Sequence, residues 1–203
     1  MSAVTVPSDR RTGLPRLGLR SARPSTRART RAELKEQRRR LRRQDRLSAQ
    51  LAELAAMDAL LDRAASVVGA GWVQGAWFTV ATSKGPRAVT AYDLPVLGHR
   101  PVTGACLVGS VVQAAGGTAE VRSQLVQRTL DALGHTLRED PDRPVQWCPG
   151  PRVRMLGVLE MTHWNDAPGR TQQEVIGLLE ATRRTVGVQR DRSRAEQSSL
   201  AVC

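Results

Sequence analysis

The chain has 203 residues, of which 40% are hydrophobic and only 3% are aromatic, so one domain with an aliphatic core plus an appendage is expected. The formal net charge of +12 is unevenly placed, because residues 1–50 hold 15 basic and 4 acidic side chains and the remainder is close to neutral. No run of 18 apolar residues is present, which excludes a transmembrane helix, and no apolar stretch follows the first basic residues, as a secretory signal would require. We therefore expect a cytoplasmic protein.

The N-terminal part of the chain changes character twice. Residues 1–29 mix proline with arginine, serine and threonine and predict a disordered basic segment. Residues 30–57 predict a basic helical arm, since no glycine or proline interrupts them, and apolar residues continue at spacings of three and four as far as Val68. The glycines at 69 and 71 predict the end of this helix.

Residues 58–186 are expected to form an α+β domain. Residues 76–81 and 87–92 predict the two strands of a hairpin, which turns at Gly85-Pro86. Residues 93–103 contain two prolines and a glycine and predict a loop.

The second half of this domain predicts two helices, a strand and a further helix. The helices are expected over residues 105–115 and from 118 to 137, and a buried strand over residues 155–162. Thr171, three residues before Glu174, forms the pattern of a capping box and predicts the start of the last helix. Residues 187–203 are expected to be a frayed polar tail. The fold class is therefore α+β, with a small sheet (a hairpin plus one further strand) packed with about four helices and preceded by the basic helical arm.

A polar turn is predicted between the strand at 155–162 and the last helix. Its side chains of interest are Trp164, Asn165, Asp166 and Arg170. Short polar side chains often bond to their own backbone in turns, so the simpler interpretation is that Trp164 fills the core while Asn165 and Asp166 shape the turn. The alternative is that this turn presents its polar groups to a ligand or a protein partner.

The helical arm carries a dense run of arginine. We predict nucleic-acid contacts for its members, which are Arg38, Arg39, Arg40, Arg42, Arg43 and Arg46. Cations near phosphates release condensed counterions and give affinity without sequence preference. No aromatic residue is interleaved with the arginines, which argues against stacking on single-stranded bases. A solvated charge run is the alternative interpretation.

Cys106 is the second lead to a function. It would lie in the first turn of the helix over 105–115, where free N–H groups and the helix dipole lower the pKa of a thiol. His163 as base and Asn165 as its orienting group would complete a catalytic set of cysteine, histidine and asparagine. The alternative is that Cys106 is a small buried hydrophobic residue. The cysteines and histidines show no metal-ligand spacing, and no motif predicts a cofactor.

Three short motifs resemble an uncharacterised family of actinobacterial and phage proteins with a domain of unknown function. They are Gly71-Trp72-x-Gln74-Gly75, Cys106-Leu107-x-Gly109 and Trp164-Asn165-Asp166-x-x-x-Arg170-Thr171. The resemblance covers about residues 58–186, and the chain departs from it at Ser110 and in insertions near residues 84–103 and 138–152. Because the family has no known activity, the resemblance implies a domain and its boundaries.

The sequence therefore favours a non-enzymatic accessory protein associated with nucleic acid, which binds phosphate through its basic arm. The α+β domain would then bind a protein partner or form a homo-oligomer. Two other functions stay open. One is a cysteine-dependent hydrolase or transferase that uses Cys106 and His163, and the other is a structural component of a phage or virion.

Overall fold

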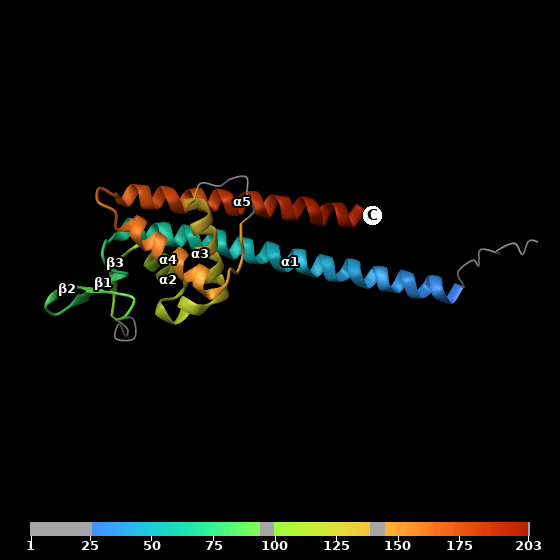
Figure 1. Ribbon diagram of the computed structural model, residues 1–203, viewed down its shortest axis with the longest axis horizontal. Coiled ribbons are helices and arrows are strands. Elements are labelled where there is room, and N and C mark those ends of the chain that lie inside the picture. The colour runs from blue at the N-terminus through green and yellow to red at the C-terminus, as the bar shows by residue number, and fades with distance from the viewer. Residues whose placement is uncertain (1–25, 94–99, 139–144, 203) are drawn as a thin grey trace, which may run out of the picture. The chain divides into compact units, whose positions relative to one another are not determined.

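A computed structural model describes residues 26–93, 100–138 and 145–202, and it has an α+β fold with five α-helices and one three-stranded antiparallel sheet in that part of the chain (Figure 1). The expected fold class is thus confirmed. In chain order the elements are α1 (Thr26–Ala70), β1 (Phe78–Thr82), β2 (Gly85–Val89), β3 (Val102–Ala105), α2 (Leu107–Ala115), the short 3-10 helix η2 (Thr118–Arg122), α3 (Gln124–Leu137), α4 (Pro151–Asn165) and α5 (Gln172–Val202). The chain divides into two units between Arg39 and Arg40, and the following description concerns the second unit unless the first is named.

The long helix α1 confirms the helix that was predicted to begin near residue 30 and end near residue 68. Its apolar residues recur at helical spacing in the second unit, and Leu54, Met57 and Leu61 are buried. Residues 30–43 are exposed, which fits their charged composition. The predicted disordered segment over residues 1–29 lies mostly outside the described residues.

The sheet has the order β2-β1-β3, and its central strand buries Phe78 and Val80 on one face. The predicted hairpin is present, although it turns at Ser83-Lys84 and Pro86 lies in the edge strand β2. Proline is tolerated there because an edge strand has one row of unpaired N–H groups. The third strand is β3, within a stretch that was predicted as loop and helix start. Four residues that follow a proline are too few to show a periodicity.

The prediction of a strand over residues 155–162 is wrong, because these residues belong to helix α4. A short apolar run fits a buried strand and a helix equally well, and here Pro151 in the first turn fixes a helical start. Leucine, methionine and glutamate in the run also favour a helix. The residues that face the body, Arg154, Val158 and Met161, recur at spacings of three and four.

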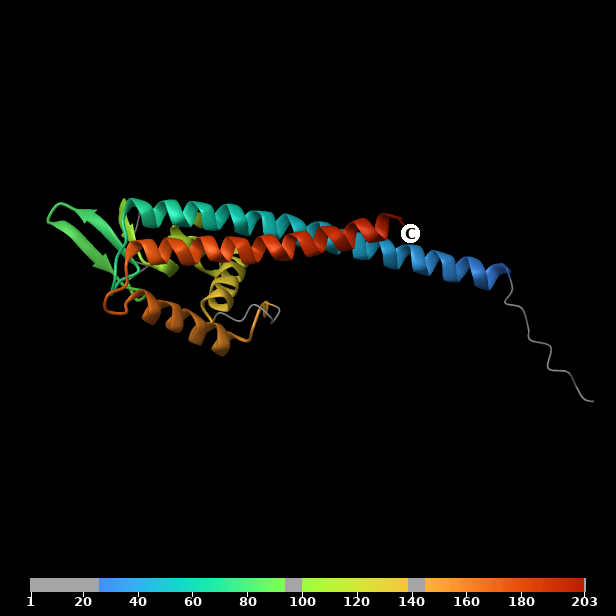
Figure 2. The same ribbon diagram turned by 90° about the horizontal axis from the view of Figure 1, so that it is seen from above.

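The prediction that the chain frays after Val186 is also wrong, because α5 continues to Val202. Both views show α5 lying along α1 (Figures 1 and 2). Ion pairs join the two helices, from Arg183 to Asp58 and Asp62 at 3.1 and 2.6 Å, and from Arg43 to Glu196 at 2.7 Å. These ion pairs stabilise the polar part of α5 after Val186 as a helix, which a short polar segment would not form stably by itself.

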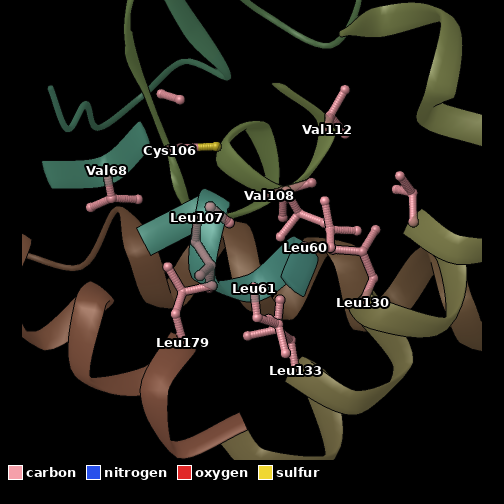
Figure 3. Close-up of a cluster of buried hydrophobic side chains, with 14 of the residues drawn as sticks. Leu60, Leu61, Val68, Cys106, Leu107, Val108, Val112, Leu130, Leu133 and Leu179 are labelled. Carbon is pink, nitrogen blue, oxygen red and sulfur yellow. The ribbon is translucent and has the colours of Figure 1, made fainter. Parts of the chain in front are cut away.

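The core lies where α1, α2, α3 and α5 meet, against one face of the sheet. Figure 3 shows its aliphatic centre, with Leu60 and Leu61 from α1 close to Val108 of α2, Leu133 of α3 and Leu179 of α5. All five side chains are fully buried. Leucine and valine supply most of this core, as the scarcity of aromatic residues required.

Candidate functional site

The three motifs, although far apart in the sequence, meet around the side chain of Asn165. This residue ends helix α4, and Asp166 follows it as the C-cap, so the predicted turn joins two helices and begins after Asn165. We call the group formed by Asn165, Asp166, residues 72–75 and the backbone N–H of Leu107 the Asn165 junction.

The amide of Asn165 is fully buried and makes four hydrogen bonds. Its Oδ1 atom accepts from Nε1 of Trp72 at 2.9 Å and from the backbone N–H of Leu107 at 3.0 Å. Its Nδ2 atom donates to the backbone oxygen of Val73 at 3.1 Å and to Oδ1 of Asp166 at 2.7 Å. Two acceptor positions and two donors are the full capacity of an amide, so Asn165 has no bond left for a ligand.

Three further bonds close the junction. The side-chain amide of Gln74 donates to the backbone oxygens of Asn165 and Ala167, at 3.0 and 3.1 Å. The backbone N–H of Gly75 donates to Oδ1 of Asp166 at 3.0 Å. The junction therefore joins the end of α1, the start of α2 and the end of α4, and it satisfies one of the unpaired N–H groups in the first turn of α2.

The motif glycines lie where two backbones touch. A Cβ atom on Gly71 would stand 2.3 Å from the backbone oxygen of Thr103, and one on Gly109 would stand 2.2 Å from that of Trp77. Both contacts are with backbone, which cannot rotate away as a side chain can. These glycines pack β3 and α2 against the segment that follows α1.

Trp164 and Arg170 form a second contact beside the junction. The guanidinium carbon of Arg170 lies 3.9 Å from the centre of the Trp164 ring, a cation–π distance. Arg170 also donates to the backbone oxygen of Trp164 at 3.1 Å and to Glu174 at 3.0 Å. The capping box is confirmed, because Thr171 and Glu174 exchange backbone and side-chain bonds at 2.8 and 3.2 Å. All four predicted turn residues thus have contacts within the fold.

Cys106 does not have the environment that was predicted for it. It is the N-cap of α2, and its sulfur accepts from the backbone N–H of Gly109 at 3.3 Å. Burial raises the pKa of this thiol to about 11, so the expected lowering of the pKa is wrong. Desolvation of the thiolate outweighs the N–H groups of the helix start. His163 is exposed on α4, while Asn165 is occupied by the junction.

The arginine run stays at the surface. In the first unit Arg38 and Arg39 are exposed, and Arg39 lies 4.0 Å from Glu36. In the second unit Arg40, Arg42, Arg43 and Arg46 are exposed.

Two of these second-unit arginines have neighbours on other elements. Arg43 pairs with Glu196, and Arg46 lines a pocket with Glu53 and Arg128. Glu196 of α5 thus pairs directly with Arg43, and most of the arginine side chains of the run face solvent.

A partly buried ion pair that the sequence did not indicate lies between α3 and α4. Asp131 accepts two bonds from Arg154, at 3.1 and 2.8 Å, and one from the backbone N–H of Cys148 at 2.9 Å. A pocket of about 170 Å³ opens beside it, lined also by His135 and Arg138. Since the carboxylate already has three donors, this pair fastens α4 to α3. Within the described ranges, no group of three or more His, Cys, Asp or Glu side chains is placed to hold a metal ion.

Comparison with known proteins gives a family match. Residues 52–185 match a family described as "Family of unknown function (DUF6197)". No curated protein and no solved structure matches the chain. The resemblance to a domain of unknown function is thereby confirmed, and all three motifs of the Asn165 junction lie inside the matched residues. None of the helices in the described part of the chain combines the length and apolar character needed to cross a bilayer.

Proposed function

We propose that this chain, which belongs to the family of unknown function DUF6197, binds the phosphate backbone of nucleic acid through the arginines of α1. The observation that carries the proposal is the exposure of Arg38, Arg39, Arg42, Arg43 and Arg46 on one long helix. Exposed cations on a helix can approach several phosphates, and each contact that releases a counterion adds affinity. Contacts of this kind fix the position of a protein on a duplex without reading its sequence.

The distribution of charge relative to the family match supports the same proposal. Residues 52–185 hold 13 basic and 13 acidic side chains, so the whole net charge of +12 lies outside the matched residues. The proposed contact is therefore a property of segments that lie outside the matched residues. The domain itself is neutral and gives no general attraction for a polyanion.

Cysteine chemistry has less support. A nucleophilic thiol must be ionised near neutral pH, and the pKa of Cys106 is raised by burial to about 11. Of the two groups proposed to assist the thiol, His163 is exposed on α4 and Asn165 is bound within the Asn165 junction.

The test compares two variants of equal charge. In one, Arg38, Arg42 and Arg46 are replaced by glutamine; in the matched control, the exposed arginines Arg87, Arg122 and Arg184 are replaced instead. Binding to a duplex of random sequence is measured by fluorescence anisotropy between low and moderate salt. The first variant should bind more weakly, and the slope of log K against log salt should fall by up to about 2.7 in magnitude, at about 0.9 for each lost contact with DNA.

The control should keep the slope of the native chain. Equal losses in both variants would show that only total charge matters, and the proposal for α1 would then be wrong. An absence of salt-dependent binding by the native chain would exclude it as well.

A further inference from the structure

A pocket lies between the facing sides of α3 and α4, two helices that lie side by side (Figure 1). Its volume is about 170 Å³, and a cavity of about 150 Å³ in another protein holds one benzene ring. Leu130 and Met161 are buried in its wall, and Val158 is half-buried there. An apolar body of the size of one aromatic ring therefore has room in this pocket and apolar side chains to contact.

Each of the two helices places a glycine in the wall of the pocket, Gly134 in α3 and Gly157 in α4. A Cβ atom on Gly134 would have no atom from elsewhere in the described residues within 4 Å, and one on Gly157 would meet Nη2 of Arg138 at 3.8 Å. Gly134 is buried, so this open space belongs to the pocket and not to the outer surface. Glycine is a poor helix former, so alanine would suit both helices better. Unlike Gly71 and Gly109, which two backbones require, these glycines provide space.

The polar groups in the wall of the pocket offer donors without acceptors. Arg138 uses Nε and Nη2 on Glu160, and among the described residues nothing accepts a bond from its Nη1. The half-buried ring of His135, one turn earlier, has no hydrogen-bond partner in the described part of the chain either. The side chain of Asp131 is only 3% exposed and already accepts three bonds. A ligand that brings acceptors would fit here, and a carboxylate matches a guanidinium best.

Both arginines in the wall are held in place by acids. Asp131 binds Arg154 through two bonds, and Glu160 binds Arg138. Because the acids offset the charge of the arginines, the attraction for a ligand rests on directed hydrogen bonds and not on a long-range field. Donors that are oriented before binding lose less conformational entropy when a ligand arrives.

We propose that the pocket between α3 and α4 binds a small monocarboxylate with an apolar body, such as an aromatic acid with one ring. The ring occupies the space beside Gly134 and Gly157, and the carboxylate accepts from Arg138 and His135. The inference is independent of the proposed nucleic-acid contact, because the pocket contains none of the arginines of α1.

The first experiment measures the binding of benzoate to the full chain by calorimetry at neutral pH, after nuclease treatment, with benzamide as the uncharged analogue. Benzoate should bind with a Kd of about 1 mM or less, a modest affinity for a ligand of its size. Benzamide should bind about tenfold more weakly or worse, because it lacks the charge-assisted bond. An absence of benzoate binding would overturn the proposal, and so would equal binding of the two probes.

Two sets of arginine variants locate the benzoate. Arg138→Gln should weaken its binding by about tenfold or more in a chain that circular dichroism shows to be folded. The variant of Arg38, Arg42 and Arg46 should bind benzoate as the native chain does, whether or not it binds nucleic acid. A loss of benzoate binding in this variant would place the anion on α1 and overturn the proposal.

The last experiment fills the pocket. Gly134→Ala combined with Gly157→Ala should raise the Tm by about 2–4 °C for each replacement, because both helices gain a better helix former. The same variant should bind benzoate about tenfold more weakly or worse, since two methyl groups crowd the ring. Gly177→Ala is the matched control, because it lies on α5 outside the pocket and its Cβ atom would meet nothing within 4 Å.

The control should raise the Tm by a similar amount and leave benzoate binding unchanged. A double variant that binds benzoate as the native chain does would show that the ligand lies elsewhere. A double variant with a lower Tm than the native chain would show that the space beside the two glycines is not open, which would also contradict the proposal.

Discussion

At the scale of single residues, the side-chain amide of Asn165 connects three segments that the chain order keeps apart. It accepts from Trp72 and from the N–H of Leu107, and it donates to the backbone of Val73. A buried group with no unused bond is expensive to replace, because each partner left behind has also been withdrawn from water.

Replacing Asn165 by alanine should therefore lower the free energy of unfolding by about 3 kcal/mol or more, since each buried polar group left without a partner costs about 1–3 kcal/mol. Denaturation in urea, followed by tryptophan fluorescence, measures the loss. His163→Ala, on the exposed side of the same helix, is the control and should change stability by less than about 0.5 kcal/mol. Equal stabilities of the two variants would mean that the junction contributes little to folding.

Cys106 gives a prediction for alkaline pH. The thiol ionises near its ordinary pKa of 9.0 in the unfolded chain, but only near 11 in the folded one, because burial disfavours the thiolate. Between these values the folded state holds a proton that the unfolded state has lost, so stability is complete below pH 9 and falls as the pH rises.

The loss should reach about 2–3 kcal/mol near pH 11, from about 1.4 kcal/mol for each pH unit. Urea denaturation of the native chain and of Cys106→Ala from pH 8 to 11 measures it. The difference in the free energy of unfolding between the native chain and Cys106→Ala should become smaller as the pH rises. A constant difference would show that ionisation of the thiol is not coupled to folding.

At the scale of elements, helix α5 extends well beyond the point where its apolar pattern fades. Residues after Val186 are polar, yet Ser193 is buried and Arg190 lies 3.8 Å from Asp58 of α1. Helical order there depends on a neighbouring helix, which a local pattern cannot report.

Hydrogen exchange tests this dependence. Backbone amides of α5 should be protected beyond Val186, at least as far as Ser193. Glu196→Lys, which opposes Arg43 with a like charge, should speed exchange in the last turns and leave the first half of α5 unchanged. Exchange at the rate of an unstructured chain directly after Val186 would support a frayed tail instead.

The elements that were predictable from the sequence are those with a strong local signal. Helix α1 has a long periodic stripe, and the start of α5 has the capping box of Thr171 and Glu174. The apolar run of α4 does not distinguish a strand from a helix, and the four residues of β3 show no pattern.

The candidate site could be predicted only in part, for a similar reason. The motifs around Trp72 and Asn165 were visible, but their meeting depends on how distant segments pack. The pKa of Cys106 depends on the core that surrounds the thiol, and its position at a helix start indicated the opposite direction.

At the scale of the whole chain, charge and family membership divide the sequence in the same way. The neutral stretch at 52–185 contains the Asn165 junction and the sheet. The net positive charge lies in the residues before and after it. The arginines of α1 can therefore be replaced without changing any residue of the matched stretch, as in the variant of Arg38, Arg42 and Arg46.

The sequence distance between the partners of Asn165 has a consequence during protein synthesis. Trp72 and the start of α2 leave the ribosome long before Asn165 does, 93 and 58 residues ahead of it. Until then the indole N–H and the first turn of α2 have only water as a partner. The nascent chain thus completes its junction only after Asn165 has been translated, and its core only after Leu179 of α5 has followed.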